Sequence, residues 1–144
     1  MELRELWFRY EKDTPDILKG VSLKVPKASM FAIVGGNGTG KSTTLKAISG
    51  ICRPYRGKVM IDGKPLNKYK SSELFKGMMA MLPQDPQSLF VHKTVAEDLG
   101  EMLSGAVYSG KDKEQLKAAR IQEIAELCEI TELLESHPYD LSGG

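Results

Sequence analysis

The sequence contains only two cysteines, no long apolar run and almost no excess of charge. Cys52 and Cys128 have no companions at metal-ligand spacing, so we interpret them as small, mostly buried apolar residues and expect no zinc site. No segment approaches the length of a membrane span, and the start Met-Glu-Leu-Arg-Glu lacks the apolar region of a signal peptide. Twenty basic and nineteen acidic residues give a net charge of +1, which provides no global attraction to nucleic acid or lipid. We therefore expect a cytosolic protein that recognises its partners by local shape.

A glycine-rich stretch from Gly35 to Thr43 reads G-G-N-G-T-G-K-S-T and fits the pattern G-x-x-x-x-G-K-[ST]. Its glycines allow successive backbone N–H groups to converge on one anion, and a helix that opens at Lys41 would aim its positive end at the same place. Lys41 would reach the β- and γ-phosphates of a nucleotide, and Ser42 would offer its hydroxyl to Mg²⁺. The residues predicted to hold the nucleotide are Gly35, Gly36, Asn37, Gly38, Thr39, Gly40, Lys41, Ser42 and Thr43.

A glycine-rich turn that matches this pattern by chance is the alternative interpretation. Such a match is expected in roughly half a per cent of chains of this length. The apolar run 30–34 before the loop and the amphipathic segment after it supply the strand and the helix that the motif requires. The context therefore favours binding of a nucleoside triphosphate.

The rest of the chain predicts an α/β core followed by helices. Apolar alternation or continuous apolar runs predict strands at residues 2–10, 17–25, 30–34, 58–61 and 78–82. The first two form a small antiparallel sheet beside the nucleotide-binding core. The first helix ends at Gly50 as a C-cap, and a short helix spans residues 71–76.

The last third of the chain is predicted to be all-α. Asp112 and Gln115 resemble a capping box. The two apolar stripes at helical spacing are Val95, Leu99, Met102 and Leu103, and then Ile121, Ile124, Ala125 and Cys128. Ordinary helix packing accounts for both stripes.

Tyr10 ends the first predicted strand, where its ring could stack on an adenine. A tyrosine in the core or at the edge of a sheet is the simpler interpretation, because aromatic residues are common in strands. Spacing alone favours the simpler interpretation.

The tetrapeptide Leu141-Ser142-Gly143-Gly144 follows the helical segment, and two glycines and a serine at a helix start form an anion-binding terminus. With the Gly35–Thr43 loop, it makes the chain resemble the nucleotide-binding domain of ATP-binding-cassette (ABC) transporters over its whole length. The resemblance implies a P-loop NTPase with an N-terminal antiparallel β subdomain, an inserted all-α subdomain, and ATP and Mg²⁺ as cofactors. It also implies that Leu141, Ser142, Gly143 and Gly144 contact the γ-phosphate held by a second cassette, in a homodimer, a heterodimer or a tandem chain.

The same resemblance assigns roles to two further residues. Tyr10 becomes the aromatic residue that stacks on adenine, which reverses the preference from spacing. Gln84 resembles the catalytic-site glutamine that joins Mg²⁺ and the attacking water to a transmembrane subunit, and residues 86–90 with the helices after them would receive a coupling helix from that subunit. The chain would then lie at the inner face of the cell membrane through partner subunits, without inserting directly and without binding nucleic acid.

Three longer runs are most similar to energy-coupling-factor ATPases, which power importers of vitamins and transition metals. They are Phe8-Arg9-Tyr10, the segment from Gln84 to Phe90 with Thr94 to Leu99, and His137 to Gly144. The last run is most like the second cassette of tandem proteins. Gly36 stands where the family more often has proline, alanine or serine.

The family's catalytic carboxylate, which follows a later apolar strand, and its switch histidine have no counterpart in the sequence. We therefore expect the chain to be a truncated form or an incomplete record that lacks the C-terminal part of the cassette, binds ATP and hydrolyses it slowly or not at all. Residues 1–85 would form the α/β nucleotide-binding core with the antiparallel subdomain, and residues 86–144 the helical subdomain that ends in the signature. Such a fragment should be marginally stable, because the apolar faces of 30–34 and 78–82 would lack cover.

Three functions are compatible with these residues. The first is the ATP-binding subunit of an energy-coupling-factor-like importer of a small solute. The second is a soluble ABC-type ATPase without membrane subunits, and the third is a nucleotide-binding fragment without turnover. The interval from Gln84 to Leu141 has the length of a transporter's helical region, whereas soluble members carry long insertions, so the first is favoured. The solute is chosen by other subunits.

Overall fold

The computed structural model describes residues 1–75, 77–104 and 112–141. The chain divides into two compact units, Met1–Ala80 and Met81–Gly144. The first unit contains a β-sheet with a helix packed on it, and the described part of the second contains only helices and connecting segments. The α/β class with an all-α last third is therefore as the sequence predicts. The proposed division at residues 85 and 86 stays a prediction.

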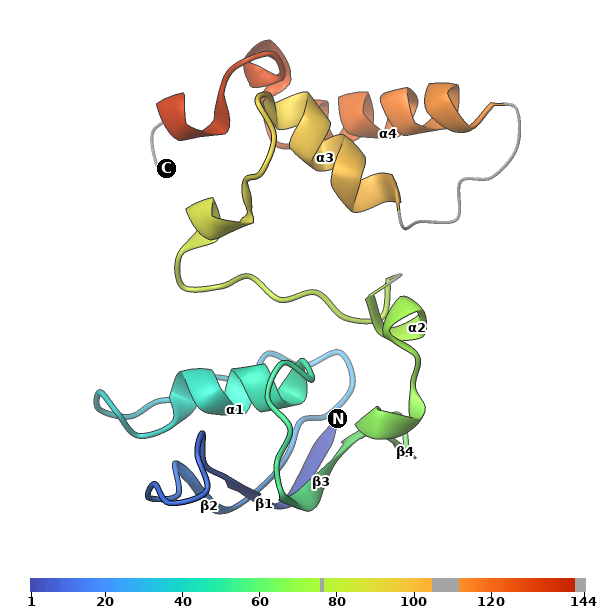
Figure 1. Ribbon diagram of the computed structural model, residues 1–144. Helices are drawn as coiled ribbons and strands as arrows, with labels where there is room; N and C mark the ends of the chain where they lie inside the picture. Colours follow the sequence, from blue (N-terminus) through green and yellow to red (C-terminus); the bar gives the residue numbers. More distant parts are fainter. Residues whose placement is uncertain (76, 105–111, 142–144) are drawn as a thin grey trace. The chain divides into compact units, whose positions relative to one another are not determined.

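The sheet of the first unit has four antiparallel strands in the order β2-β1-β3-β4 (Figure 1). The first two strands pair with each other, which confirms the predicted small antiparallel sheet. A tight turn at Asp62 and Gly63 joins the last two strands, and Lys64 and Pro65 pair with β3 as a short strand. The strands are β1 (Glu2–Phe8), β2 (Leu18–Lys24), β3 (Arg56–Ile61) and β4 (Lys64–Pro65).

A bulge in β1 changes which of its side chains face the core. Glu5 has φ 51°, and the pairing register of β1 shifts at this position against both of its neighbours, β2 and β3. Gly57 of β3 lies against this bulge with φ 93°, and a Cβ there would overlap the carbonyl oxygens of Arg4 and Glu5. A bulge adds one residue to a strand and turns the following side chains to the other face. Leu3 and Leu6 therefore share one face although they are three residues apart.

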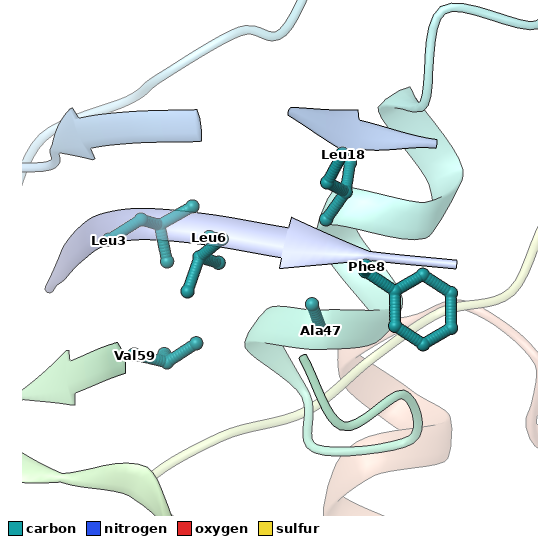
Figure 2. Packing of buried hydrophobic residues seen from close by; sticks show 6 residues of the cluster. All are labelled: Leu3, Leu6, Phe8, Leu18, Ala47 and Val59. Carbon is teal, nitrogen blue, oxygen red and sulfur yellow. The ribbon is translucent and has the colours of Figure 1, made fainter. Parts of the chain in front are cut away.

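The core of the first unit lies between the sheet and helix α1 (Lys41–Ile48). Leu3, Leu6 and Leu18 are at most 1% exposed, and burial of a leucine side chain stabilises the fold by about 1.5–3 kcal/mol. Figure 2 shows how the side chains converge from the strands and the helix. The cluster consists of Leu3, Leu6, Phe8, Leu18, Ala47 and Val59.

Two predicted strands are absent from the described structure. Residues 30–34 and 78–82 have no strand conformation, and the side chains of Met30 and Val34 are 100% and 88% exposed. A strand is held by hydrogen bonds to a neighbour, and none of the described strands pairs with either segment. Their apolar sequences are therefore not sufficient to make them strands, and the prediction is wrong for this structure.

The helices follow the sequence prediction closely. Helix α1 ends at Ile48, and Gly50 follows its C-cap with φ 78°, which confirms the predicted stop. The remaining α-helices are α2 (Ser71–Phe75), α3 (Val95–Ser104) and α4 (Lys113–Leu127). Four short 3₁₀ helices are η1 (Leu66–Lys68), η2 (Pro86–Leu89), η3 (Thr131–Leu133) and η4 (Pro138–Asp140).

In the second unit α3 and α4 pack against each other. Ala125 is fully buried, whereas Met102 is 61% exposed and Cys128 is also exposed, so the predicted stripes and the predicted burial of Cys128 are wrong at these two positions. Cys128 lies beyond the end of α4, as its C-cap.

The predicted capping box at Asp112 does not form, because no side chain caps the start of α4. A capping box forms instead at α3. The Glu97 N–H donates to Thr94 Oγ1 at 3.2 Å, and the Thr94 N–H donates to Glu97 Oε2 at 3.2 Å. Asp98, which is 6% exposed, accepts the N–H groups of Val91 and His92 with the same oxygen, Oδ1.

Candidate functional site

Helix α1 begins at Lys41, directly after the glycine-rich loop, as the motif requires. Gly40 is its N-cap, in the left-handed conformation with φ 88°, and no side chain caps the first turn. A Cβ at Gly40 would lie 3.1 Å from Leu18 Cδ2 and 3.2 Å from the Ile17 carbonyl oxygen. Both the backbone angle and the lack of space therefore require glycine here. The first turn of α1 keeps backbone N–H groups that no side-chain cap uses, which is the arrangement of an anion-binding helix start.

The Lys41 side chain folds back over the loop. Its ammonium donates to the carbonyl oxygen of Gly35 at 2.9 Å and to that of Gly36 at 2.6 Å. Thr39 Oγ1 also donates to the Gly36 carbonyl at 2.9 Å. The cation is thus held within the loop by main-chain oxygens, which are weaker partners for an ammonium than phosphate oxygens are.

The three hydroxyl residues after Lys41 have different surroundings. Ser42 is exposed, whereas Thr43 and Thr44 are buried. Thr44 Oγ1 donates back to the Gly40 carbonyl at 2.9 Å and tightens the first turn. Thr43 Oγ1 lies 3.3 Å from the Tyr10 hydroxyl, so this predicted nucleotide-binding residue contacts the tyrosine in the present structure. Asn37 and Gly38 lie exposed in the loop.

Tyr10 stands beside the start of α1, although 33 positions separate it from Thr43. The edge-to-face contact with Phe8, with ring centroids 5.0 Å apart, anchors the ring to the core, yet 59% of Tyr10 is exposed. An exposed aromatic ring next to a helix start can offer a flat surface to a base whose phosphates lie at that helix.

Tyr55, which the sequence analysis did not identify, holds the segment after Tyr10 in place through Asp16. Tyr55 donates its hydroxyl hydrogen to Asp16 Oδ1 at 2.9 Å, and the Arg9 guanidinium lies 4.9 Å from the centre of the Tyr55 ring. Partial loss of surrounding water and the hydrogen bond to Asp16 raise the pKa of Tyr55 above its ordinary value. Tyr55 and Asp16 belong to none of the motifs named above, so only the fold brings these two residues together.

Mg²⁺ binds oxygen ligands and usually keeps several waters, with one or two protein ligands beside nucleotide phosphates. The exposed hydroxyl of Ser42, at the start of α1, fits that role. Within the described residues no three His, Cys, Asp or Glu side chains gather as a metal cluster.

The other predicted site residues belong to the second unit. Gln84 is exposed in the segment before η2, and Leu141 is half-buried directly after η4. Ser142, Gly143 and Gly144, the rest of the predicted signature, lie outside the described residues. The structure thus brings Tyr10 together with the phosphate loop in one unit and places Gln84 and Leu141 in the other.

A tyrosine that the sequence analysis did not single out links the two segments of the second unit that carry these residues. The Tyr139 hydroxyl donates to the Gln87 carbonyl at 3.1 Å, and its ring meets that of Phe90 edge to face, with centroids 6.1 Å apart. His137, two residues before Tyr139, is the N-cap of η4. None of the helices in the described part of the chain has both the length and the apolarity needed to cross a bilayer.

Comparison with known proteins places these features in one family. The sequence matches the ABC transporter family over residues 18–144. It is 33% identical over its whole length to the energy-coupling factor transporter ATP-binding protein EcfA1 of Mycoplasmopsis pulmonis, of which the alignment covers 52%. Among solved structures, cbiO1 from Clostridium perfringens, part of the ABC transporter complex cbiONQ, is 25% identical with a TM-score of 0.78, and the match covers 98% of this chain and 55% of that one.

A dimeric ATP-binding cassette in a post-hydrolysis state, bound to ADP and Pi, is also 25% identical with a TM-score of 0.77. The match covers 99% of this chain and 63% of that one. The chain spans between about a third and a half of the length of several curated relatives that it matches. The family match over most of the sequence and the shared fold agree with the loop geometry, and the chain belongs to the ABC transporter family.

Proposed function

We propose that the chain is the Mg-ATP-binding part of the ATPase subunit of an energy-coupling-factor-like transporter that powers import of a small solute. The observation that carries the proposal is the start of α1, where the left-handed Gly40, the Lys41 ammonium and the exposed Tyr10 ring lie around one helix end. The solved cassette bound to ADP and Pi supports the choice of nucleotide.

The residues of the loop would act together on the phosphates. Lys41 would exchange the carbonyl oxygens of Gly35 and Gly36 for the β- and γ-phosphate oxygens, which are better partners because they are charged. The backbone N–H groups from Gly38 to Thr43 would supply donors without reorganisation of side chains. Ser42 would offer its hydroxyl to Mg²⁺, which neutralises charge on the phosphates when bound.

Tyr10 would hold the base. Tyr10 is 59% exposed and its ring meets Phe8 edge to face, so a base could stack on the exposed part of the ring without rearrangement of the core. Stacking of a base on an aromatic ring contributes about 1–3 kcal/mol. The hydroxyl contact with Thr43 sets the position of the ring relative to the helix start.

The proposal extends to assembly. A second cassette would meet the signature that begins at Leu141, and a transmembrane subunit would contact the segment after Gln84, so the protein would lie at the inner face of the membrane through its partners. The named transporter relatives support this arrangement. Isolation of the native protein from gently extracted membranes should recover a membrane subunit with it, and recovery of the protein alone would favour a soluble ABC-type ATPase.

Nucleotide binding is tested with two lysines of the same helix. Lys41→Ala should weaken Mg-ATP binding by about 1.5–3 kcal/mol, the contribution of a hydrogen bond to a charged group, as measured by titration calorimetry. Lys46→Ala removes an equal charge from the last turn of α1 and should leave affinity unchanged. Equal affinities of the Lys41 variant and the original chain would contradict the proposed site.

A further inference from the structure

The near-neutral chain separates its charges between its two units. Residues 1–80 contain fifteen Lys and Arg and seven Asp and Glu, a net charge of +8. Residues 81–144 contain five Lys and Arg and twelve Asp and Glu, a net charge of −7. The absence of a global field therefore does not exclude strong local ones.

Five of the fifteen basic residues of the first unit lie on the outer face of its sheet, opposite the buried cluster of Leu3 and Leu6. Residues directly opposite each other in an antiparallel pair point to the same face. The register pairs Arg4 with Lys58, and places Trp7 between Lys19 and Arg56. The exposed basic residues of this basic sheet face are Arg4, Lys19, Lys24, Arg56 and Lys58.

Acidic residues hardly offset this charge. Strands β1, β2 and β3 carry two of them, Glu2 and Glu5. The Arg4 guanidinium donates to Glu2 Oε2 at 2.7 Å, and this hydrogen bond lowers the pKa of Glu2, which keeps the carboxylate ionised and neutralises one cation. Lys19, Lys24, Arg56 and Lys58 remain as an excess of positive charge on adjacent strands.

The position of Trp7, at the centre of this face, helps to distinguish between nucleic acid and other anionic partners. A Cβ on Gly20 would lie 3.5 Å from the Trp7 ring, so the indole lies flat against the backbone of β2. The Arg56 guanidinium is 5.7 Å from the centre of the indole, and the buried Nε1 has no hydrogen-bond partner. The indole of the half-buried Trp7 is therefore already in contact with β2 and Arg56, and it offers a base less surface than the exposed aromatic platforms of proteins that bind single-stranded nucleic acid.

We propose that the basic sheet face docks on the anionic headgroups of a lipid bilayer. Its exposed basic side chains lie on one face of a sheet, and such clusters of positive charge are attracted to anionic headgroups. An interface with a folded protein is instead normally centred on apolar residues. Membership in a transporter family places a bilayer within reach of the chain. This contact is distinct from tethering through a membrane subunit and does not depend on bound nucleotide.

The test compares two double variants of equal net charge. Lys19→Gln with Lys58→Gln neutralises the face, and Lys68→Gln with Lys70→Gln neutralises two exposed lysines at η1 and before α2. Sedimentation of the 144-residue chain with phosphatidylglycerol-containing vesicles should show about 25-fold weaker binding for the first variant, because each basic residue near an anionic surface contributes about fivefold. Binding of the second variant should stay within about twofold. Binding should also fall at high salt and be absent with pure phosphatidylcholine vesicles.

Several results would overturn the proposal. They are an equal loss in both double variants, equal binding to uncharged vesicles, and binding of a single-stranded RNA or polyglutamate in place of the anionic vesicles. A double Lys→Arg variant at positions 19 and 58 should retain vesicle binding, and its failure to do so would count equally against a role for charge. Urea unfolding of each variant verifies that the compared chains are equally folded.

Discussion

The two units of the chain are held together in different ways. The first buries leucines and a phenylalanine between a sheet and a helix, with long-range pairs such as Leu3 with Val59. In the described part of the second, Ala125 is the only buried apolar residue of an α-helix, and polar contacts such as those of Asp98 fix the segment before α3. A polar contact depends on the geometry of one or two atoms, whereas an apolar core depends on total area and volume. The two units should therefore respond differently to substitution.

The largest effect is expected from Leu6→Ala. Leu6 is fully buried, so the variant should lower the free energy of unfolding of the first unit by about 2–5 kcal/mol through lost burial and the cavity left behind. Leu99 on α3 is only half-buried. The matched change Leu99→Ala should therefore lower the free energy of unfolding of the second unit by less, about 1–2 kcal/mol. Urea unfolding followed by hydrogen exchange of each unit measures both, and equal losses would remove the proposed difference.

A smaller effect is expected from Asp98→Ala. The variant removes the charged acceptor of the Val91 and His92 N–H groups, and a hydrogen bond to a charged group contributes about 1.5–3 kcal/mol. Exchange of these two amide hydrogens should accelerate more than that of α4 amides. Asp98→Asn keeps an oxygen acceptor and should recover most of the protection. Unchanged exchange in the alanine variant would mean that apolar packing, not the carboxylate, orders this segment.

The smallest effect on stability is expected at the helix caps, where the starts of α3 and α4 differ. Thr94→Ala should cost about 1 kcal/mol of stability because Thr94 Oγ1 accepts the Glu97 N–H at the start of α3. Asp112→Ala should cost much less, because no side chain caps α4. Thermal unfolding monitored by circular dichroism compares the two, and a larger loss at position 112 would contradict the assignment of the caps.

Local patterns predicted the elements that depend on local chemistry. The start of α1 at Lys41 and its stop before Gly50 follow from glycine geometry and helix propensity, and both appear in the structure. The role of the Gly35–Thr43 loop in binding phosphate stays a prediction. The resemblance to the ABC family, carried by short motifs, is confirmed by the family match. The roles of Gln84 and the signature remain predictions.

Long-range pairing set the limits of prediction. The alternation in β1 breaks at Glu5 because Gly57, more than fifty residues away, lets the strands approach at the bulge. The apolar runs 30–34 and 78–82 have strand-like sequences, but none of the described strands pairs with them. The basic sheet face likewise depends on which strands are neighbours, so a count of charges along the sequence could not reveal it.

The contact at Gly40 fixes a dimension of the molecule. A Cβ at Gly40 would lie only 3.2 Å from the Ile17 carbonyl oxygen, so the helix start lies close to the main chain of residue 17. The Ile17 N–H also donates to the Phe8 carbonyl at 2.8 Å, so main-chain contacts connect the start of α1 with the strand that leads to Tyr10. In the proposed site this spacing would set the distance between the bound base and its phosphates, and a larger residue at position 40 would change it.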